Sequence, residues 1–116
     1  MRKVTKEVCT AFINGERKTV GNTTTDGERL WLHGNLIARK VNGTIEVTMA
    51  GWATPTTKER LNGIIDLLAW DNDSWRFRPV DRFHQSDFVQ YYGDDAVDST
   101  DWINIGTYDL VRNYPF

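Results

Sequence analysis

Few side chains in this 116-residue chain have the type and spacing that metal chemistry needs. The histidines are His33 and His84, and a two-histidine, one-carboxylate site would have to join them through a residue such as Asp26 or Asp81. The spacing does not indicate that arrangement. We expect His33 to be a hydrogen-bonded structural residue at a strand end and His84 to lie in a solvated loop. No metal site and no cofactor are therefore predicted.

Catalysis by a nucleophile or by paired carboxylates is not indicated either. The aspartates of the second half lie among Asn, Ser and Gly, which is typical of exposed turns rather than of pockets that shift a pKa. Cys9 has no histidine near it in the sequence. The glycine-bounded segment 21–27 lacks the lysine of a phosphate loop, and Glu59 opposes an anion at a helix start near Thr56. The chain is predicted not to be an enzyme.

Charge is divided unevenly along the chain. Residues 1–60 hold ten Lys or Arg against six Asp or Glu, whereas residues 61–116 hold four Arg against ten Asp. In the second half aspartates are interleaved with aromatic residues, a mixture that can anchor and steer a basic protein partner. The expected partner-binding residues are Tyr91, Tyr92, Asp94, Asp95, Asp98, Asp101 and Trp102.

Nucleic-acid binding is the alternative. The first half supplies the two ingredients of a single-strand binder, which are positive charge for the backbone and aromatic rings for base stacking. The candidate residues are Arg29, Arg39, Lys40, Trp52, Lys58 and Arg60. They do not form a run, and the net charge of −2 argues against a dedicated nucleic-acid binder.

The helices and strands that must position these residues can be predicted from periodicity and turn signals. Apolar residues at helical spacing predict a helix over 4–14 that ends at Asn14-Gly15, although the same dipeptide would also suit a hairpin turn. We expect residues 16–27 to be mostly loop, with a brief strand at 18–20.

Three strands, at 30–33, 36–41 and 44–49, are predicted to form a meander with turns at Gly34-Asn35 and Asn42-Gly43. Alternation assigns one face to the core, namely Trp31, His33, Leu36, Ala38, Ile45, Val47 and Met49. The opposite face would carry Leu30, Leu32, Ile37, Arg39, Val41, Glu46 and Thr48, with Arg39 and Glu46 as a cross-strand ion pair.

A second helix is predicted to start at Thr56, whose side chain would form a capping box with Glu59, and to end at Asn62-Gly63. Residues 64–70 fit either a further helical turn or a strand. Beyond them we expect a strand at 75–80 and weaker strands at 87–92 and 102–105, around an acidic loop at 94–98.

Two separated phrases in the first half resemble a known family. They are Thr25-Asp26-Gly27 … Leu32-His33-Gly34-Asn35-Leu36-Ile37-Ala38 and Gly51-Trp52 … Thr56-Thr57-Lys58-Glu59-Arg60-Leu61-Asn62-Gly63. This pattern looks like a family of small proteins encoded by tailed bacteriophages, over roughly residues 8–63. The resemblance implies a phage origin and residence in an infected bacterium, but no activity.

The prediction is thus an α+β fold in which an antiparallel β-meander packs with two short helices and is followed by a β-rich C-terminal section. We expect a single domain over 1–116, with a scaffold over 1–69 and an acidic, aromatic section over 70–116. A lone cysteine excludes an internal disulfide, and the absence of a signal peptide or a span of ~20 apolar residues points away from membranes and toward the host bacterial cytoplasm.

The predicted function is a phage-encoded, non-enzymatic binding protein that modifies or inhibits a bacterial host protein, including a defence or nucleic-acid-handling complex. Single-stranded nucleic-acid binding is the second interpretation, and a virion or assembly component is the third.

Overall fold

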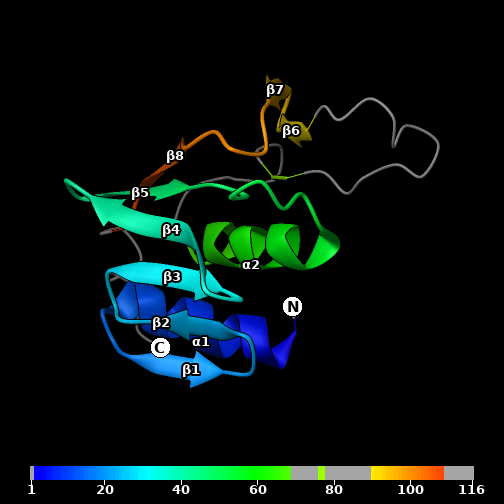
Figure 1. Ribbon diagram of the computed structural model, residues 1–116. Coiled ribbons are helices and arrows are strands. Elements are labelled where there is room, and N and C mark those ends of the chain that lie inside the picture. The colour runs from blue at the N-terminus through cyan, green and yellow to red at the C-terminus, as the bar shows by residue number, and fades with distance from the viewer. Residues whose placement is uncertain (1, 69–75, 78–89, 109–116) are drawn as a thin grey trace.

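A computed structural model describes residues 2–68, 76–77 and 90–108 of the chain (Figure 1). Within them the elements are α1 (Lys3–Asn14), β1 (Lys18–Val20), β2 (Thr23–Thr25), β3 (Arg29–Leu32), β4 (Asn35–Val41), β5 (Thr44–Val47), α2 (Pro55–Asp66), β6 (Gln90–Tyr92), β7 (Asp95–Val97) and β8 (Ile103–Thr107). Five consecutive strands separate α1 from α2, three more follow α2, and all the described strand pairs are antiparallel, so the predicted α+β class is confirmed.

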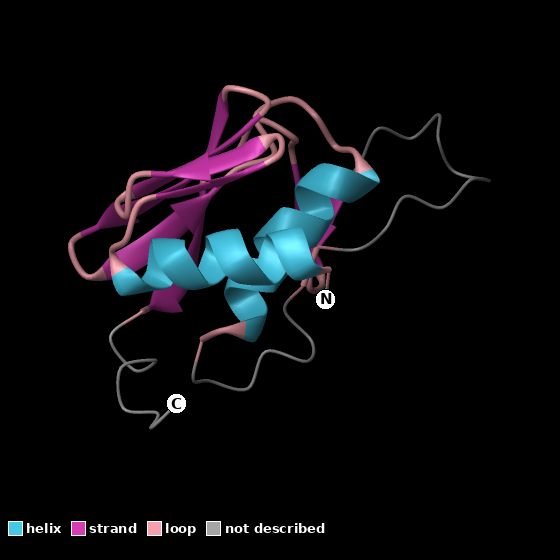
Figure 2. Cartoon of the chain, turned by 90° about the horizontal axis from the view of Figure 1, so that it is seen from below, coloured by secondary structure: helices cyan, strands magenta, loops and turns pink. Residues whose placement is uncertain are grey.

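The main sheet has six strands in the order β1-β2-β3-β4-β5-β8. Its first five strands are neighbours in sequence, whereas β8 returns from the C-terminal section to pair with β5, with Val47 opposite Ile103. Strands β6 and β7 form a separate hairpin. Figure 2 shows α1 and α2 on the same side of the main sheet. The core therefore lies between the helices and one face of the sheet, and no described helix covers the other face.

Helix α1 forms as its apolar spacing predicts, because Val8, Cys9 and Phe12 are fully buried. It ends at Gly15, which has φ +77° and begins the return of the chain. The N–H of Glu16 donates to the carbonyl of Ala11 at 2.8 Å, a helix-ending bond that rules out the alternative hairpin.

The prediction of loop over 16–27 was only partly right. The brief strand at 18–20 is confirmed as β1, but a further strand, β2, follows it at once. Thr23 and Thr25 of β2 face the core, and Thr24 faces the other way. Threonine carries a β-branched side chain that suits a strand, and its hydroxyl needs a partner when it is buried. That pattern is easily mistaken for a polar loop.

The meander is confirmed, but the first hairpin is shifted by one residue. The turn uses His33 and Gly34, both with positive φ, so that Leu32 lies opposite Asn35. The face assignment of β3 was therefore wrong, since Leu30 and Leu32 are buried while His33 is exposed and Trp31 is half-buried.

A register irregularity between β3 and β4 corrects the alternation further along the sheet. Leu36 lies opposite Trp31, but Ala38 lies opposite Leu30, so both Ile37 and Ala38 point into the core. Leu36, like Trp31, is only half-buried, and neither belongs to the fully buried core that we predicted. The second hairpin, with Asn42 and Gly43 in its turn, places Ile45, Val47 and Met49 in the core as predicted.

Helix α2 starts earlier than the predicted capping box and ends later than the predicted terminator. Its N-cap is Thr54 rather than Thr56, and the Thr54 hydroxyl accepts the N–H of Thr57 at 3.2 Å, with Pro55 in the first helical position. The helix continues through Gly63 to Asp66, because burial of Ile64 and Ile65 outweighs the local terminator signal.

The prediction for the C-terminal section is partly confirmed in the residues that the structure describes. The expected strand at 87–92 is β6, and that at 102–105 is β8, extended to Thr107. The predicted acidic loop is instead the hairpin of β6 and β7, in which Tyr92 lies opposite Asp95. Phe77 forms an isolated bridge with Tyr92. His84, Asp81, Asp87 and most of the predicted strand at 75–80 lie outside the described residues.

Candidate functional site

The helix-free face of the main sheet carries a continuous row of polar side chains. Cross-strand pairing places Arg29 of β3 beside Arg39 of β4, Arg39 beside Glu46 of β5, and Glu46 beside Asn104 of β8. The guanidinium of Arg39 donates to Glu46 at 2.9–3.0 Å, so the predicted cross-strand ion pair is confirmed. Four strands thus contribute to one surface, which we call the open face.

Two tryptophans lie under the arginines of the open face. The guanidinium carbon of Arg39 is 3.8 Å from the centroid of the Trp102 ring, and that of Arg29 is 5.9 Å from the Trp31 ring. Trp102 is 37% exposed, so its stack with Arg39 leaves indole surface available to a partner. Trp31, expected in the core, instead belongs to this face.

Carboxylates offset the positive charge of these arginines. Arg39 is paired with Glu46, and the Arg29 guanidinium lies 3.7 Å from a carboxylate oxygen of Asp26. The Asp26 carboxylate also accepts the backbone N–H groups of Glu28 and Arg29, and these bonds, that of Glu28 first, lower its pKa. The open face therefore combines aromatic surface with locally balanced charge.

The acidic residues of the predicted partner surface lie in two turns that precede Trp102 in the sequence. Asp94 and Asp95 are exposed in the β6–β7 hairpin. Asp98 and Asp101 brace the following turn: Asp98 accepts the N–H and hydroxyl of Thr100 at 3.0 and 2.9 Å, and Asp101 accepts the N–H of Asp98 at 2.8 Å. The bonds from Thr100 lower the pKa of Asp98. Both turns keep their carboxylates at the surface.

The aromatic residues of that prediction separate into two kinds. Tyr91 is 40% exposed, whereas Tyr92 is 6% exposed and stacks on Phe77 with ring centroids 5.1 Å apart. Burial raises the pKa of Tyr92 to about 12. Tyr92 thus anchors the hairpin to the core, and Tyr91 and Trp102 are the aromatic residues that reach the surface.

The six candidate nucleic-acid residues do not come together. Arg29 and Arg39 share the open face, but Lys40 points to the helix side, where its ammonium lies 4.7 Å from the Tyr108 ring centroid and donates to the carbonyl of Ile13. Trp52 is 59% exposed and follows Gly51, whose N–H donates to the carbonyl of Ser99 at 3.0 Å, in the connection between β5 and α2. Lys58 and Arg60 are only 4% and 2% exposed.

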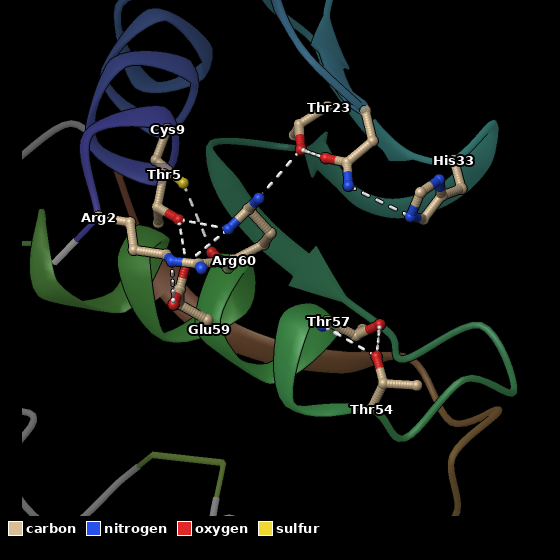
Figure 3. Close-up of polar contacts among 10 residues, drawn as sticks. Arg2, Thr5, Cys9, Thr23, His33, Thr54, Thr57, Glu59 and Arg60 are labelled. Atoms are coloured by element: carbon tan, nitrogen blue, oxygen red, sulfur yellow. Dashed lines mark hydrogen bonds and ion pairs between the residues drawn. The ribbon is translucent and has the colours of Figure 1, made fainter.

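Arg60 is the hub of a buried polar network that joins α1, β2 and α2 (Figure 3). Its guanidinium donates to Thr5 at 2.6 Å and to Thr23 at 3.0 Å, and it is paired with Glu59. The sulfur of Cys9 donates to the Arg60 carbonyl at 3.4 Å. A buried guanidinium requires such partners. Because the Arg60 guanidinium donates to interior groups and is not exposed, it does not offer a binding site for the phosphates of a nucleic acid.

Lys58 connects α2 to the C-terminal section. Its ammonium donates to the side-chain oxygen of Gln90, which is itself buried at the start of β6. Burial lowers the pKa of Lys58, because loss of hydration disfavours the charged ammonium. This bond holds the acidic hairpin against the helical layer.

A basic hollow that sequence analysis did not predict lies between α1 and β1. It has a volume of about 600 Å³ and its charged lining residues are Lys3, Lys6, Glu7, Glu16, Arg17 and Lys18. The helical spacing of Lys3 and Lys6 signals that they share a face of α1, but only the fold shows that β1 passes beside them.

The described residues contain no group of three or more His, Cys, Asp and Glu side chains arranged to hold a metal ion. Neither of the helices in the described part of the chain is long and apolar enough to cross a membrane.

Comparison with known proteins identifies one relationship. The family model of the Kyanoviridae Gp96 protein matches residues 1–109. The match extends well beyond the two phrases that carried the resemblance and includes β6, β7 and β8. No curated protein and no solved structure matches the chain.

Proposed function

We propose that this chain, which belongs to the Kyanoviridae Gp96 protein family of bacteriophage proteins, is a non-enzymatic binding protein that modifies or inhibits a bacterial host protein. It would act in the cytoplasm of the infected bacterium. The proposed contact surface comprises Trp102 with Arg39 on the open face, together with Tyr91 and the exposed carboxylates of Asp94, Asp95, Asp98 and Asp101.

The stack of Arg39 on Trp102 is the observation that carries this proposal. Tryptophan and arginine are the residues that most often dominate binding energy at protein interfaces. Here the two lie 3.8 Å apart, and the ion pair with Glu46 restricts the arginine. A side chain that is already ordered loses less conformational entropy when a partner binds.

The negative charge of the residues that precede Trp102 favours a basic partner. Asp94, Asp95, Asp98 and Asp101 are all exposed and lie within the eight residues that precede Trp102 in sequence. Carboxylates at the rim of an interface accelerate association with a positively charged surface more than they add affinity. Proteins that handle nucleic acid, including defence complexes, display such basic surfaces.

Affinity purification from a lysate of infected host cells tests the proposal. Wild-type protein should retain a host protein, and Trp102→Ala should lose it. The matched control is Trp52→Ala, which removes a more exposed tryptophan that is not part of the proposed contact surface and should retain the host protein. Replacing Asp94 and Asp95 by Asn should slow association in a salt-dependent manner. Unchanged retention by both the Trp102 and the Asp variants would rule out this surface.

Single-stranded nucleic-acid binding remains the second candidate because Arg29 and Trp31 extend the Arg–Trp pattern across the open face. Fluorescence anisotropy with a labelled single-stranded oligonucleotide at two salt concentrations tests it. Micromolar, salt-sensitive binding that is lost in the Arg29→Ala, Arg39→Ala double variant would favour this function over host-protein binding. Many copies in purified virions would instead favour the structural role.

A further inference from the structure

A pocket separate from the open face lies between the β3–β4 turn and the start of α2. It has a volume of about 460 Å³, within the range of small-molecule sites. Both phrases that carried the family resemblance contribute to it, with His33 and Asn35 from the first and Trp52, Thr56 and Thr57 from the second. Figure 3 shows His33 at one end of this region and Thr54 with Thr57 at the other.

The lining excludes a charged ligand. Its floor consists of Leu32, Ile37 and Met49, which are 4%, 1% and 0% exposed. None of the lining residues is Asp, Glu, Lys or Arg. A phosphate or carboxylate would therefore lose its hydration without gaining a counter-ion, so the pocket suits an uncharged molecule.

Trp52 contributes the aromatic wall of the pocket from a fixed backbone. Its side chain is 59% exposed, yet its backbone is held on both sides: its N–H donates to the carbonyl of Met49, and its carbonyl accepts the N–H of Thr54, each at 2.8 Å. Ala50 and Gly51 make the preceding turn with φ values of +54° and +82°. An exposed indole on a fixed backbone is prepared to stack against a flat ring.

The rim offers hydrogen-bonding groups that the protein itself does not use up. The Thr54 and Thr57 hydroxyls form one hydrogen bond at 3.0 Å, in which either can be the donor. The Thr54 hydroxyl also accepts the N–H of Thr57. Whichever hydroxyl donates within the pair, the other keeps a hydrogen to donate. Among the described residues, the Asn35 amide has no side-chain hydrogen-bond partner.

A hydrogen-bond chain fixes the orientation of His33. Arg60 donates to the Thr23 hydroxyl, which donates to the side-chain oxygen of Asn22 at 2.8 Å. The Asn22 amide nitrogen must then face His33, where it lies 3.2 Å from Nε2 (Figure 3). In the neutral ring Nε2 is the acceptor, so Nδ1 carries the hydrogen.

We propose that this pocket binds an uncharged heteroaromatic molecule of nucleoside size, stacked on Trp52 and hydrogen-bonded along its edge to the Thr54–Thr57 pair and Asn35. A flat apolar ring with polar atoms on its rim matches the apolar floor, the aromatic wall and the unsatisfied polar rim together. None of the residues of the proposed contact surface lines this pocket, although Gly51, next to Trp52, donates its N–H to the carbonyl of Ser99 in the turn that precedes Trp102.

Titration with adenosine, guanosine, cytidine and uridine, followed by calorimetry and by backbone amide NMR, tests this proposal. At least one nucleoside should bind and shift the signals of His33, Trp52 and Thr57. Trp52→Ala should weaken that binding roughly tenfold, the size expected for the loss of one stacking partner. The matched control Trp102→Ala should bind with unchanged affinity.

Three results would overturn it. One is the absence of binding by all four nucleosides at millimolar concentration. Another is much tighter binding of adenosine monophosphate than of adenosine, which would require a cation that the lining lacks. The third is tighter binding of N-acetyl-tyrosinamide, whose ring is not heteroaromatic, than of any nucleoside, which would make the pocket a receptor for a partner's aromatic side chain.

Discussion

A Cβ atom on Gly27 would lie 2.6 Å from both the carbonyl carbon and the oxygen of Gly15. The turn between β2 and β3 therefore packs backbone against backbone on the C-terminal end of α1. Thr25 supports this turn by accepting the Gly27 N–H at 3.0 Å and donating to the Arg29 carbonyl at 2.7 Å. The Thr25-Asp26-Gly27 phrase is thus a structural feature that joins the sheet to the first helix.

Substitution of Gly27 by alanine should be much more destabilising than the same change at Gly21. Both residues have positive φ, +94° and +59°, but a Cβ at Gly21 meets nothing within 4 Å. Gly21→Ala should cost about 1 kcal/mol of unfolding free energy from backbone strain alone. Gly27→Ala adds the clash and should cost at least about 2 kcal/mol more. Equal losses in urea unfolding would show that the β2–β3 turn can move away from α1.

Arg60→Met should destabilise the fold by about 3 kcal/mol, because it leaves the buried hydroxyls of Thr5 and Thr23 without their guanidinium donor and removes the buried charge that is paired with Glu59. Lys3→Ala is the control, since the Lys3 side chain is 89% exposed and its loss should cost less than about 0.5 kcal/mol. Chemical denaturation measures both. An Arg60→Met variant as stable as Lys3→Ala would contradict the role of Arg60 as a buried hub.

Alkaline pH should destabilise the protein through Cys9. Burial raises the pKa of this thiol from 9.0 to about 12, so the unfolded state ionises first. The stability it contributes is complete below pH 9 and is lost as the pH rises toward 12, by about 1.4 kcal/mol per pH unit. Unfolding free energies measured between pH 8 and 10 should fall for wild type and fall less for Cys9→Ala.

Comparison of the two proteins isolates Cys9 from other groups. Tyr92, whose pKa is also raised, acts in the same direction above pH 10, and Lys58, whose pKa is lowered by burial, acts in the opposite direction. Both are present in each protein and cancel in the difference. Parallel slopes for wild type and Cys9→Ala would show that the thiol is more accessible than the structure indicates.

The same alanine-to-glycine change should have opposite effects at two positions. Ala50 has φ +54°, a conformation that costs an alanine about 1 kcal/mol, so Ala50→Gly should leave stability unchanged or raise it by up to about 1 kcal/mol. Ala11 lies inside α1, where glycine should lower stability by about 1 kcal/mol. Thermal unfolding should show this difference in sign. A large loss at Ala50 would mean that the packing of its methyl group against the core outweighs the backbone strain.

The two hairpin turns show how far local rules carry a prediction. Asn42-Gly43 is the preferred pair for a tight turn, and it forms as expected with both φ values positive. At the first hairpin, Gly34 occupies the second turn position and His33 the first, with φ +51°. Histidine is less common than asparagine in that conformation, so the turn was placed one residue late.

The displaced turn exchanged the predicted faces of β3 and of Leu36 and Ile37 in β4, but the error did not extend along the rest of the predicted core face. The irregularity at Ile37 restores the alternation, so Ala38, Ile45 and Val47 are buried as predicted. Such irregularities depend on how a strand must bend over its neighbours. Local sequence does not specify that geometry, although it does specify the strands themselves.

Lys58 and Arg60 were candidate nucleic-acid-binding residues, a role that needs exposed side chains, but both are buried, which charged residues almost never are without partners. Their partners are Gln90 for Lys58, and Thr5 and Thr23 for Arg60. All three come from other elements and are distant in sequence. Periodicity along one helix cannot show such contacts. For the same reason it could not predict the pocket beside Trp52, whose lining residues come from segments distant in sequence.

The placement of β8 has a kinetic consequence. Strands β1 to β5 pair with their sequence neighbours, so their contacts close short loops and should form early during folding. The pairing of Val47 with Ile103 closes a far longer loop and should form late. Trp102 meets Arg39 only when that last strand arrives. A time-resolved fluorescence signal from this pair would therefore mark the end of folding, and the proposed contact surface would exist only on chains that have completed it.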